Sequence, residues 1–113
     1  MPYISTKVTT EITHDKEQVL KARLGEAITL IGKPESFLML SFEENCRIWF
    51  AGEAEEDAAY VEVALLHSAP KSSYEKLTEA ICNILSEELS IPSGRIYVKF
   101  SETEYWGWDG RMF

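Results

Sequence analysis

The chain has 113 residues, 45% of them hydrophobic and 27% charged, and its formal net charge is −8 at pH 7. This length predicts a single domain, residues 1–113, with a core of its own. The negative charge argues against a nucleic-acid partner, which needs a basic face to neutralise phosphates. The sequence contains no run of 18 apolar residues, so it predicts no membrane-spanning helix.

The start of the chain lacks the pattern of a signal peptide, so we expect a cytoplasmic protein or one secreted without such a signal. Its two cysteines, Cys46 and Cys82, are far apart and outside any C-x-x-C motif. They therefore give no support for a zinc site or for thiol redox chemistry, and we expect no metal and no cofactor.

The first half of the sequence predicts a strand, a helix and a second strand. Residues 3–10 are rich in β-branched side chains, which favour a strand. Residues 15–31 predict a helix, with Asp15 as its cap and Gly32 at its end. Residues 37–43 predict the second strand. The apolar side chains at helical spacing are Leu20, Leu24, Ala27, Ile28 and Ile31.

A less regular segment, residues 45–58, follows. Residues 48–50 (Ile-Trp-Phe) suggest a short strand, because all three favour an extended backbone. Residues 53–57 include four acidic side chains, and we expect them to form a solvated loop.

The pattern of the first half then returns. Residues 60–66 predict a strand, and Ser72 with Glu75 predicts a capping box at the start of a helix. Residues 95–101 predict the last strand. The apolar side chains of this helix are Leu77, Ile81, Ile84 and Leu85.

The two halves, about residues 2–44 and 59–102, therefore align as repeats. At one constant offset, Leu38, Leu40 and Phe42 fall on Ile96, Val98 and Phe100. Strand periodicity puts each triplet on one face, which we expect to pack under the helices. Two right-handed β-α-β units predict a four-stranded sheet with both helices on one face, an α+β fold. The other face would be uncovered, so we expect self-association to cover it.

Pro2 follows the initiator Met1. Aminopeptidases remove an initiator methionine when the next residue is small, and the mature chain would then start with a free secondary amine. A free α-amino group titrates near roughly 8, and an apolar pocket or a nearby cation lowers that value. Such an amine can act as a general base at neutral pH.

Four short motifs occur in order: Met1-Pro2 opening a strand, Gly32-Lys33-Pro34, the segment from Pro92 to Tyr97, and Trp106-Gly107-Trp108-Asp109-Gly110 near Phe113. Together they resemble the tautomerase superfamily in its macrophage migration inhibitory factor branch, which includes D-dopachrome tautomerase. The resemblance implies a homotrimer whose sheets form a central barrel-like core. It also implies active sites at the subunit interfaces.

The resemblance also implies the roles of several residues. Pro2 matches the catalytic proline, and Lys33 matches the lysine that holds the substrate carboxylate. Leu66 matches a residue whose backbone N–H contacts substrate, and Tyr97 matches a tyrosine supplied by the neighbouring subunit. Without the resemblance, Lys33 would be an exposed lysine at a helix end, which the helix dipole favours.

Three further residues belong to the expected substrate site. Trp106 and Phe113 match apolar pocket walls, although Trp106 and Tyr97 could equally pack at a trimer interface. Lys99 stands where the animal cytokines carry asparagine, and we hypothesise that it adds a second contact to a carboxylate or an enolate. Trp108 is expected to be structural.

The function implied is keto–enol tautomerisation of a small partner, a phenylpyruvate-like aryl 2-oxo acid or a dopachrome-like compound, with Pro2 as general acid and base. The alternative is a cytokine-like signalling protein with vestigial activity, whose receptor the sequence does not identify. A third reading is decarboxylation or dehalogenation, which would enlist an arginine such as Arg47 or Arg111.

Overall fold

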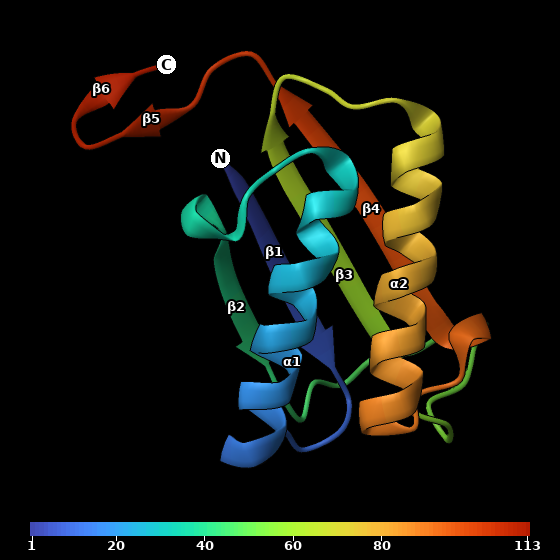
Figure 1. Cartoon of the computed structure of the whole chain (residues 1–113). Helices are drawn as coiled ribbons and strands as arrows, with labels where there is room; N and C mark the ends of the chain where they lie inside the picture. Colours follow the sequence, from blue (N-terminus) through green and yellow to red (C-terminus); the bar gives the residue numbers. More distant parts are fainter.

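The computed structural model describes residues 1–113 as a sheet with two helices packed on one side (Figure 1). Three short 3-10 helices accompany them: Ile28–Ile31, Glu35–Phe37 and Ser93–Arg95. The strands and α-helices are β1 (Pro2–Val8), α1 (His14–Ala27), β2 (Met39–Glu43), β3 (Ala59–Leu66), α2 (Lys71–Leu89), β4 (Ile96–Thr103), β5 (Gly107–Trp108) and β6 (Arg111–Met112).

The four long strands form one mixed sheet in the order β2-β1-β3-β4. β1 and β2 are parallel, β3 and β4 are parallel, and the two pairs meet through antiparallel β1 and β3. Each parallel pair is joined through one helix, as two β-α-β units require. The predicted α+β fold with an internal repeat is therefore confirmed.

The core lies between the sheet and the two helices. The predicted triplets Leu38-Leu40-Phe42 and Ile96-Val98-Phe100 both pack on this side. Burial of these side chains is the main force that holds the helices on the sheet. Side chains that are fully buried there include Ile4, Val61, Val63 and Leu65 of the sheet and Leu20, Ile28, Leu77, Ile81 and Leu85 of the helical side.

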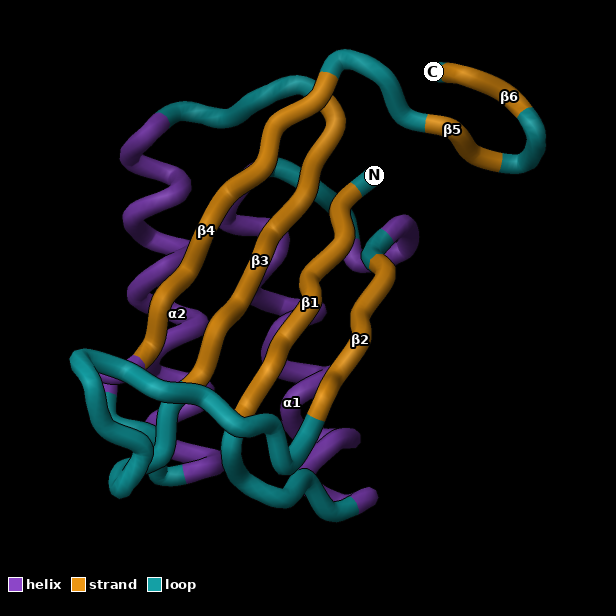
Figure 2. Tube along the Cα trace, turned by 180° about the vertical axis from the view of Figure 1, so that it is seen from behind, coloured by secondary structure: helices purple, strands orange, loops and turns teal.

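The opposite face of the sheet carries no helix (Figure 2). Alternation along β1 and β3 sends every second side chain to this face, where those side chains are half-buried or exposed. It includes aromatic, aliphatic, hydroxyl and charged groups. The expected uncovered face is thus present in the chain.

Both predicted helix caps are wrong, each by two residues. Thr13, not Asp15, caps α1, and its hydroxyl accepts a hydrogen bond from the Lys16 backbone at 3.2 Å. Pro70 precedes α2, so Ser72 lies inside the helix and does not cap it. At α1 a second polar residue takes the cap, whereas α2 begins after a proline and has no side-chain cap.

The segment between β2 and β3 contains no strand at residues 48–50. Phe50 instead forms an isolated bridge with Glu53 across a tight turn. The acidic loop that follows is solvated at residues 54–57, but Glu53 forms an ion pair with Arg95. The strand predicted from the propensities of residues 48–50 does not form, because these residues pair with no strand of the sheet.

Neither helix has the combination of length and apolar composition that crossing a membrane demands. No group of three or more His, Cys, Asp or Glu side chains is arranged to bind a metal ion.

Candidate active site

Pro2 lies buried at the start of β1, at the end of the sheet where β3 finishes. It pairs with Leu65, and the next residue of β3, Leu66, donates its backbone N–H to the Met1 carbonyl oxygen at 3.4 Å. While Met1 is attached, the Pro2 nitrogen is an amide and cannot accept a proton. Removal of Met1 would leave the Leu66 N–H pointing at the space beside the new terminal amine.

Lys33 lies at the same end of the sheet because the helical segment after α1 stops there. Gly32 ends that segment with a left-handed backbone (φ 75°), a conformation that glycine adopts without steric cost. The half-buried Lys33 then donates from Nζ to the Leu66 carbonyl oxygen at 3.2 Å. Its charge lies close to the N-terminus of the chain.

The environment of the N-terminus favours a neutral amine. Partial burial, and after it the positive charge of Lys33, lowers the pKa of the Met1 amino group from its ordinary value of 8.0. Both causes belong to the surroundings and not to methionine itself. A terminal amine on Pro2, one residue further into the sheet, would be exposed to the same two influences.

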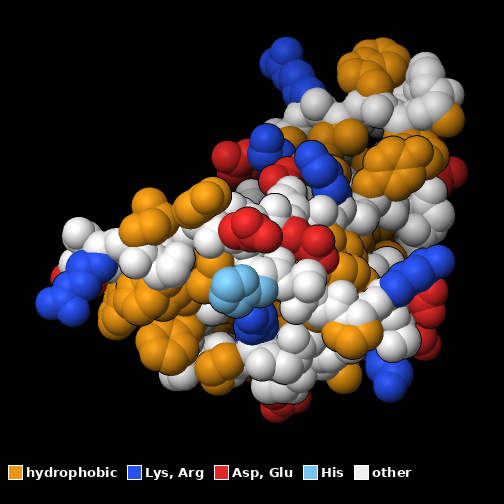
Figure 3. All heavy atoms as spheres, turned by 90° about the horizontal axis from the view of Figure 1, so that it is seen from above, with side chains coloured by type: hydrophobic (Ala, Val, Ile, Leu, Met, Phe, Trp, Pro, Cys, Tyr) orange, Lys and Arg blue, Asp and Glu red, His pale blue; other side chains and the backbone are white.

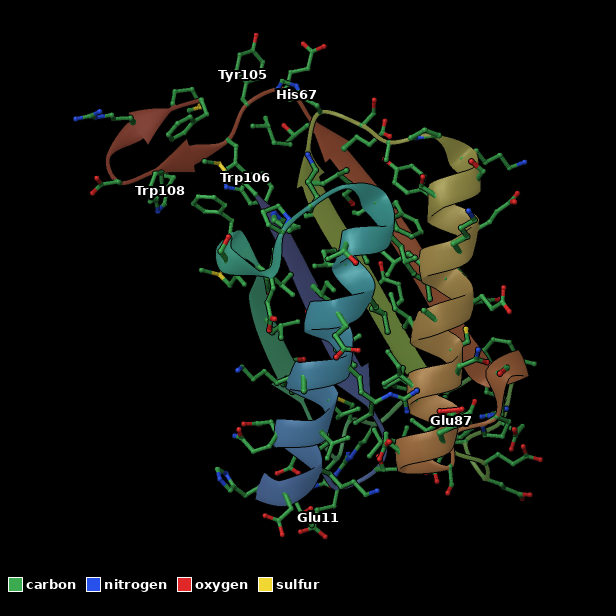
Figure 4. The ribbon with its side chains drawn as sticks, viewed as in Figure 1. Glu11, His67, Glu87, Tyr105, Trp106 and Trp108 are labelled. Atoms are coloured by element: carbon green, nitrogen blue, oxygen red, sulfur yellow. The ribbon has the colours of Figure 1, made fainter.

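An apolar cleft of about 470 Å³ opens beside Pro2. Its walls include Phe37 and Met39 from the entry to β2, and Trp106 and Trp108 from the C-terminal segment. Figure 4 shows Trp106 and Trp108 reaching from that segment toward the start of β1. A cleft of this size and lining suits a small aryl compound.

The C-terminal hairpin of β5 and β6 forms one side of this cleft. Trp108 contacts Phe37 edge-on, with ring centroids 6.0 Å apart, and lies 5.7 Å from the ring of Phe113. The Phe113 backbone N–H donates to the Trp106 carbonyl at 2.8 Å and closes the hairpin. Seen from above, hydrophobic side chains gather over this hairpin (Figure 3). Trp108 therefore lines the cleft, a position that the sequence analysis did not predict for it.

A second hollow, of about 370 Å³, is lined without any hydrophobic residue. It includes His67, Glu102 and Glu104. His67 has a left-handed backbone (φ 67°) and donates its N–H to the Thr103 carbonyl at 2.7 Å. Two carboxylates without a cation make this hollow a poor site for an anionic substrate.

Tyr97 and Lys99 lie far from Pro2 within one chain. Tyr97 pairs with Tyr60, which pairs with Lys7, five residues along β1 from Pro2. At about 3.3 Å per residue this separation is roughly 16 Å along the strand, before the spacing between strands is added. A pocket that contains both Pro2 and Tyr97 therefore needs a second chain.

Lys99 has a carboxylate as its cross-strand neighbour, Glu62. Both oxygens of Glu62 are engaged by hydroxyl groups: Tyr60 donates to Oε1 at 2.8 Å, and Ser101 donates to Oε2 at 3.3 Å. The bond from Tyr60 is the main cause that lowers the pKa of Glu62, and the charge of Lys99 lowers it further.

The structure adds an aromatic contact at the Tyr97 end of β4 that the sequence did not reveal. The Phe50 ring meets the Tyr97 ring edge-on at 5.2 Å, and the Arg95 guanidinium lies 5.2 Å from the centre of the Phe50 ring. Arg95 is buried and also donates to the backbone carbonyls of Glu56 and Asp57, each at 3.0 Å. The sequence analysis placed Arg95 at the start of the predicted strand 95–101 and gave no signal of this contact.

The arrangement defines a class: an internally repeated α+β protein with a buried proline at the start of its first strand, a lysine beside it and an aromatic cleft. The family model described as macrophage migration inhibitory factor (MIF) matches residues 1–113. The chain belongs to this family. Membership supports a tautomerase-like or MIF-like function.

Known structures agree with this assignment. MIF2 of Leishmania major is 33% identical over 100% of this chain and 97% of that chain, with a TM-score of 0.93. The MIF homologue of Prochlorococcus marinus is 26% identical over 98% of both chains, with a TM-score of 0.83. A fused 4-OT, described as a symmetric trimer, shares the fold at 19% identity over 89% of this chain and 85% of that chain, with a TM-score of 0.79. A comparison with curated sequences gave no match.

Proposed function

We propose that this chain is a keto–enol tautomerase of phenylpyruvate-like aryl 2-oxo acids, with the amine of Pro2 as its general acid and base. The observation that carries the proposal is the convergence of three groups at one end of the sheet. These groups are the start of β1 at Pro2, the ammonium of Lys33 and the backbone N–H of Leu66. The aromatic cleft lies directly beside them.

Each part of the substrate has a partner in this arrangement. Lys33 would bind the carboxylate, because its ammonium is the cation that faces the terminus. The Leu66 N–H would bind the oxygen on C2, since it now donates to the Met1 carbonyl in that space. The aryl ring would enter the cleft between Phe37 and Trp106.

The reaction then needs only one proton carrier. The neutral amine of Pro2 takes a proton from C3, and the electron pair of the C–H bond forms the C2–C3 double bond. The electrons of the C2–O double bond move to oxygen, which becomes an enolate held by the Leu66 N–H. The Pro2 ammonium returns its proton to that oxygen and is neutral again. Burial and the charge of Lys33 lower the pKa of the Met1 amino group, and the same two causes would favour the neutral form of a Pro2 amine.

A homotrimer is part of the proposal. The uncovered face of the sheet mixes Tyr3, Ala64 and Leu66 with charged groups, a composition that a neighbouring subunit can cover. The separation of Tyr97 from Pro2 within one chain also calls for a shared pocket. The fused 4-OT with this fold is a symmetric trimer. We expect native mass spectrometry of this protein to give the mass of three chains.

The test is a phenylpyruvate tautomerase assay on wild type and Pro2→Gly, with the intact mass of each preparation measured first. Wild type without Met1 should be active. Pro2→Gly keeps an amine but loses the rigid ring, and we expect kcat/KM to fall by about a hundredfold, within the range of general acid–base catalysis.

Pro70→Ala is the control, because Pro70 is an exposed proline at the start of α2. It should keep its activity within about twofold, which is under roughly half a kcal/mol. Full activity of protein that retains Met1 would exclude the amine at residue 2 as the base. Full activity of Pro2→Gly would exclude a need for the proline ring.

A further inference from the structure

We infer that Tyr74 of α2 is a positioning residue of the active site, whose hydroxyl group keeps the Leu66 carbonyl oxygen where it orients Lys33. It does so through residues 67–70, the loop that joins β3 to α2. This inference rests on the proposed function, because Lys33 is the group proposed to bind the substrate carboxylate. Tyr74 does not line the cleft beside Pro2, so it would act on the site only through the loop.

The first step concerns the bonds of the Tyr74 hydroxyl group. It accepts a hydrogen bond from the Ala69 backbone N–H at 3.0 Å and donates one to Glu102 Oε2 at 2.5 Å. The second bond has the length of a charge-assisted hydrogen bond to a carboxylate. The Tyr74 ring stacks on the Phe100 ring, with ring centroids 4.3 Å apart. The hydroxyl group therefore ties the loop backbone to β4, and the stacked ring holds the hydroxyl group in place.

The second step concerns the start of α2, which lacks a side-chain cap. Pro70 precedes the first turn, and its side chain accepts no hydrogen bond from the helix. Ala69 and Tyr74 instead occupy the two positions of a hydrophobic staple, which fixes the direction in which a chain enters a helix, and both pack against the core. A phenylalanine in place of Tyr74 would keep this apolar contact and lose only the bonds of the hydroxyl group. Tyr74→Phe therefore separates the anchoring of the loop from the burial of the ring.

The third step concerns the strain in the loop. His67 has a left-handed backbone, which is unfavourable for a residue with a Cβ atom and persists only where the surroundings hold it. Its N–H donates to the Thr103 carbonyl oxygen at one end of the loop, and the Tyr74 hydroxyl group holds the other end. The oxygen of the peptide bond between Leu66 and His67 accepts a hydrogen bond from Lys33. Without the hydroxyl group His67 can relax, and we expect the Leu66 carbonyl oxygen to turn away from Lys33.

The test is the phenylpyruvate tautomerase assay on Tyr74→Phe, with kcat/KM measured against pH. Lys33 should lose its acceptor and turn into water, so KM should rise at least about threefold. The acid limb of kcat/KM should move to higher pH, because Lys33 would then lower the pKa of the terminal amine less. Both changes should be smaller than those in Lys33→Gln. A general loss of folded enzyme would lower kcat but would leave KM and the acid limb in place.

The double variant that combines Lys33→Gln with Tyr74→Phe tests the route of the effect. With Lys33 absent, Tyr74→Phe should change KM by less than about twofold, because the group on which the loop acts is no longer there. A purely structural role of Tyr74 would give the same change in KM with and without Lys33.

Tyr105→Phe is the matched control, because Tyr105 is exposed and bonds to Thr103 through its backbone and not through its hydroxyl group. It should keep the KM and the pH profile of wild type, and native mass spectrometry should show the wild-type assembly for every variant. An unchanged KM and acid limb in Tyr74→Phe overturn the inference, as does an equal rise in KM with and without Lys33. A wild type without Met1 that does not isomerise phenylpyruvate overturns the proposed function together with the inference, so the two failures are distinct.

Discussion

The contrast between two arginines gives a direct test of how burial sets the strength of an ion pair. Arg95 is 9% exposed and pairs with Glu53, while its other donors reach the carbonyls of Glu56 and Asp57 at 3.0 Å. The side chain of Arg23 is 35% exposed, and it pairs with two glutamates of α2 at 2.7 and 3.0 Å. Counting ion pairs alone would rank Arg23 higher.

The expected magnitudes follow from these surroundings. Arg95→Met removes two hydrogen bonds from a charged donor to backbone carbonyls, each worth about 1.5 kcal/mol. Loss of the pair with the half-exposed Glu53 adds at most about 1 kcal/mol, because that carboxylate regains water. We expect the free energy of unfolding to fall by about 3 kcal/mol. Arg23→Met should cost less than about 1 kcal/mol, since Glu87 stays solvated and Glu88 keeps its ion pair with Lys16.

The assay is urea unfolding of both variants and wild type at one protein concentration, because assembly would make stability depend on concentration. The variants should differ by a factor of three or more in their loss of unfolding free energy. Arg95→Met should also raise KM for the aryl substrate, since Phe50 loses its cation and no longer holds the ring of Tyr97. Equal losses of stability in the two variants would refute the reasoning from burial.

Two further predictions concern the active site and the core. Lys33→Gln removes the cation that disfavours protonation of the terminal amine, so the pKa of that amine should rise. The acid limb of kcat/KM against pH should therefore move to higher pH, and KM should increase. An acid limb that stays in place or moves to lower pH would contradict this prediction. Thr6 has a buried hydroxyl without a hydrogen-bond partner, so Thr6→Val should raise the free energy of unfolding by about 1 kcal/mol. Thr9→Val is its control and should be destabilising, because the Thr9 hydroxyl accepts from the buried Ala58 N–H at 3.0 Å; a gain in stability there would contradict the account.

The fold was largely predictable because its information is periodic. Alternation at residues 37–43 and 95–101 located two strands and their buried faces, and the spacing of apolar residues located both helices. The boundaries and caps were less predictable. Thr13 and Asp15 are both good cap residues, and in the structure Thr13 is the one that caps α1.

Part of the candidate site could also be predicted from the sequence, and part could not. Pro2 and Lys33 were predicted from short motifs, and the structure brings them together with Leu66 because β1, β3 and the end of the first helical segment finish at one edge. The apolar walls from Phe37 and Trp108 were missed, although Trp108 stood within a predicted motif. The roles of all these residues in catalysis remain predictions for the assays above.

By itself the sequence determined the two repeated units, their buried faces and the family, because alternation, helical spacing and ordered motifs are local properties of a chain. Only the tertiary structure decided which side chains meet across distant segments. It joined Arg95 to the loop at residues 50–57, placed Lys99 beside Glu62, and separated Tyr97 from Pro2 by the length of a strand. Such contacts depend on strand register and loop path, which no short stretch of sequence encodes.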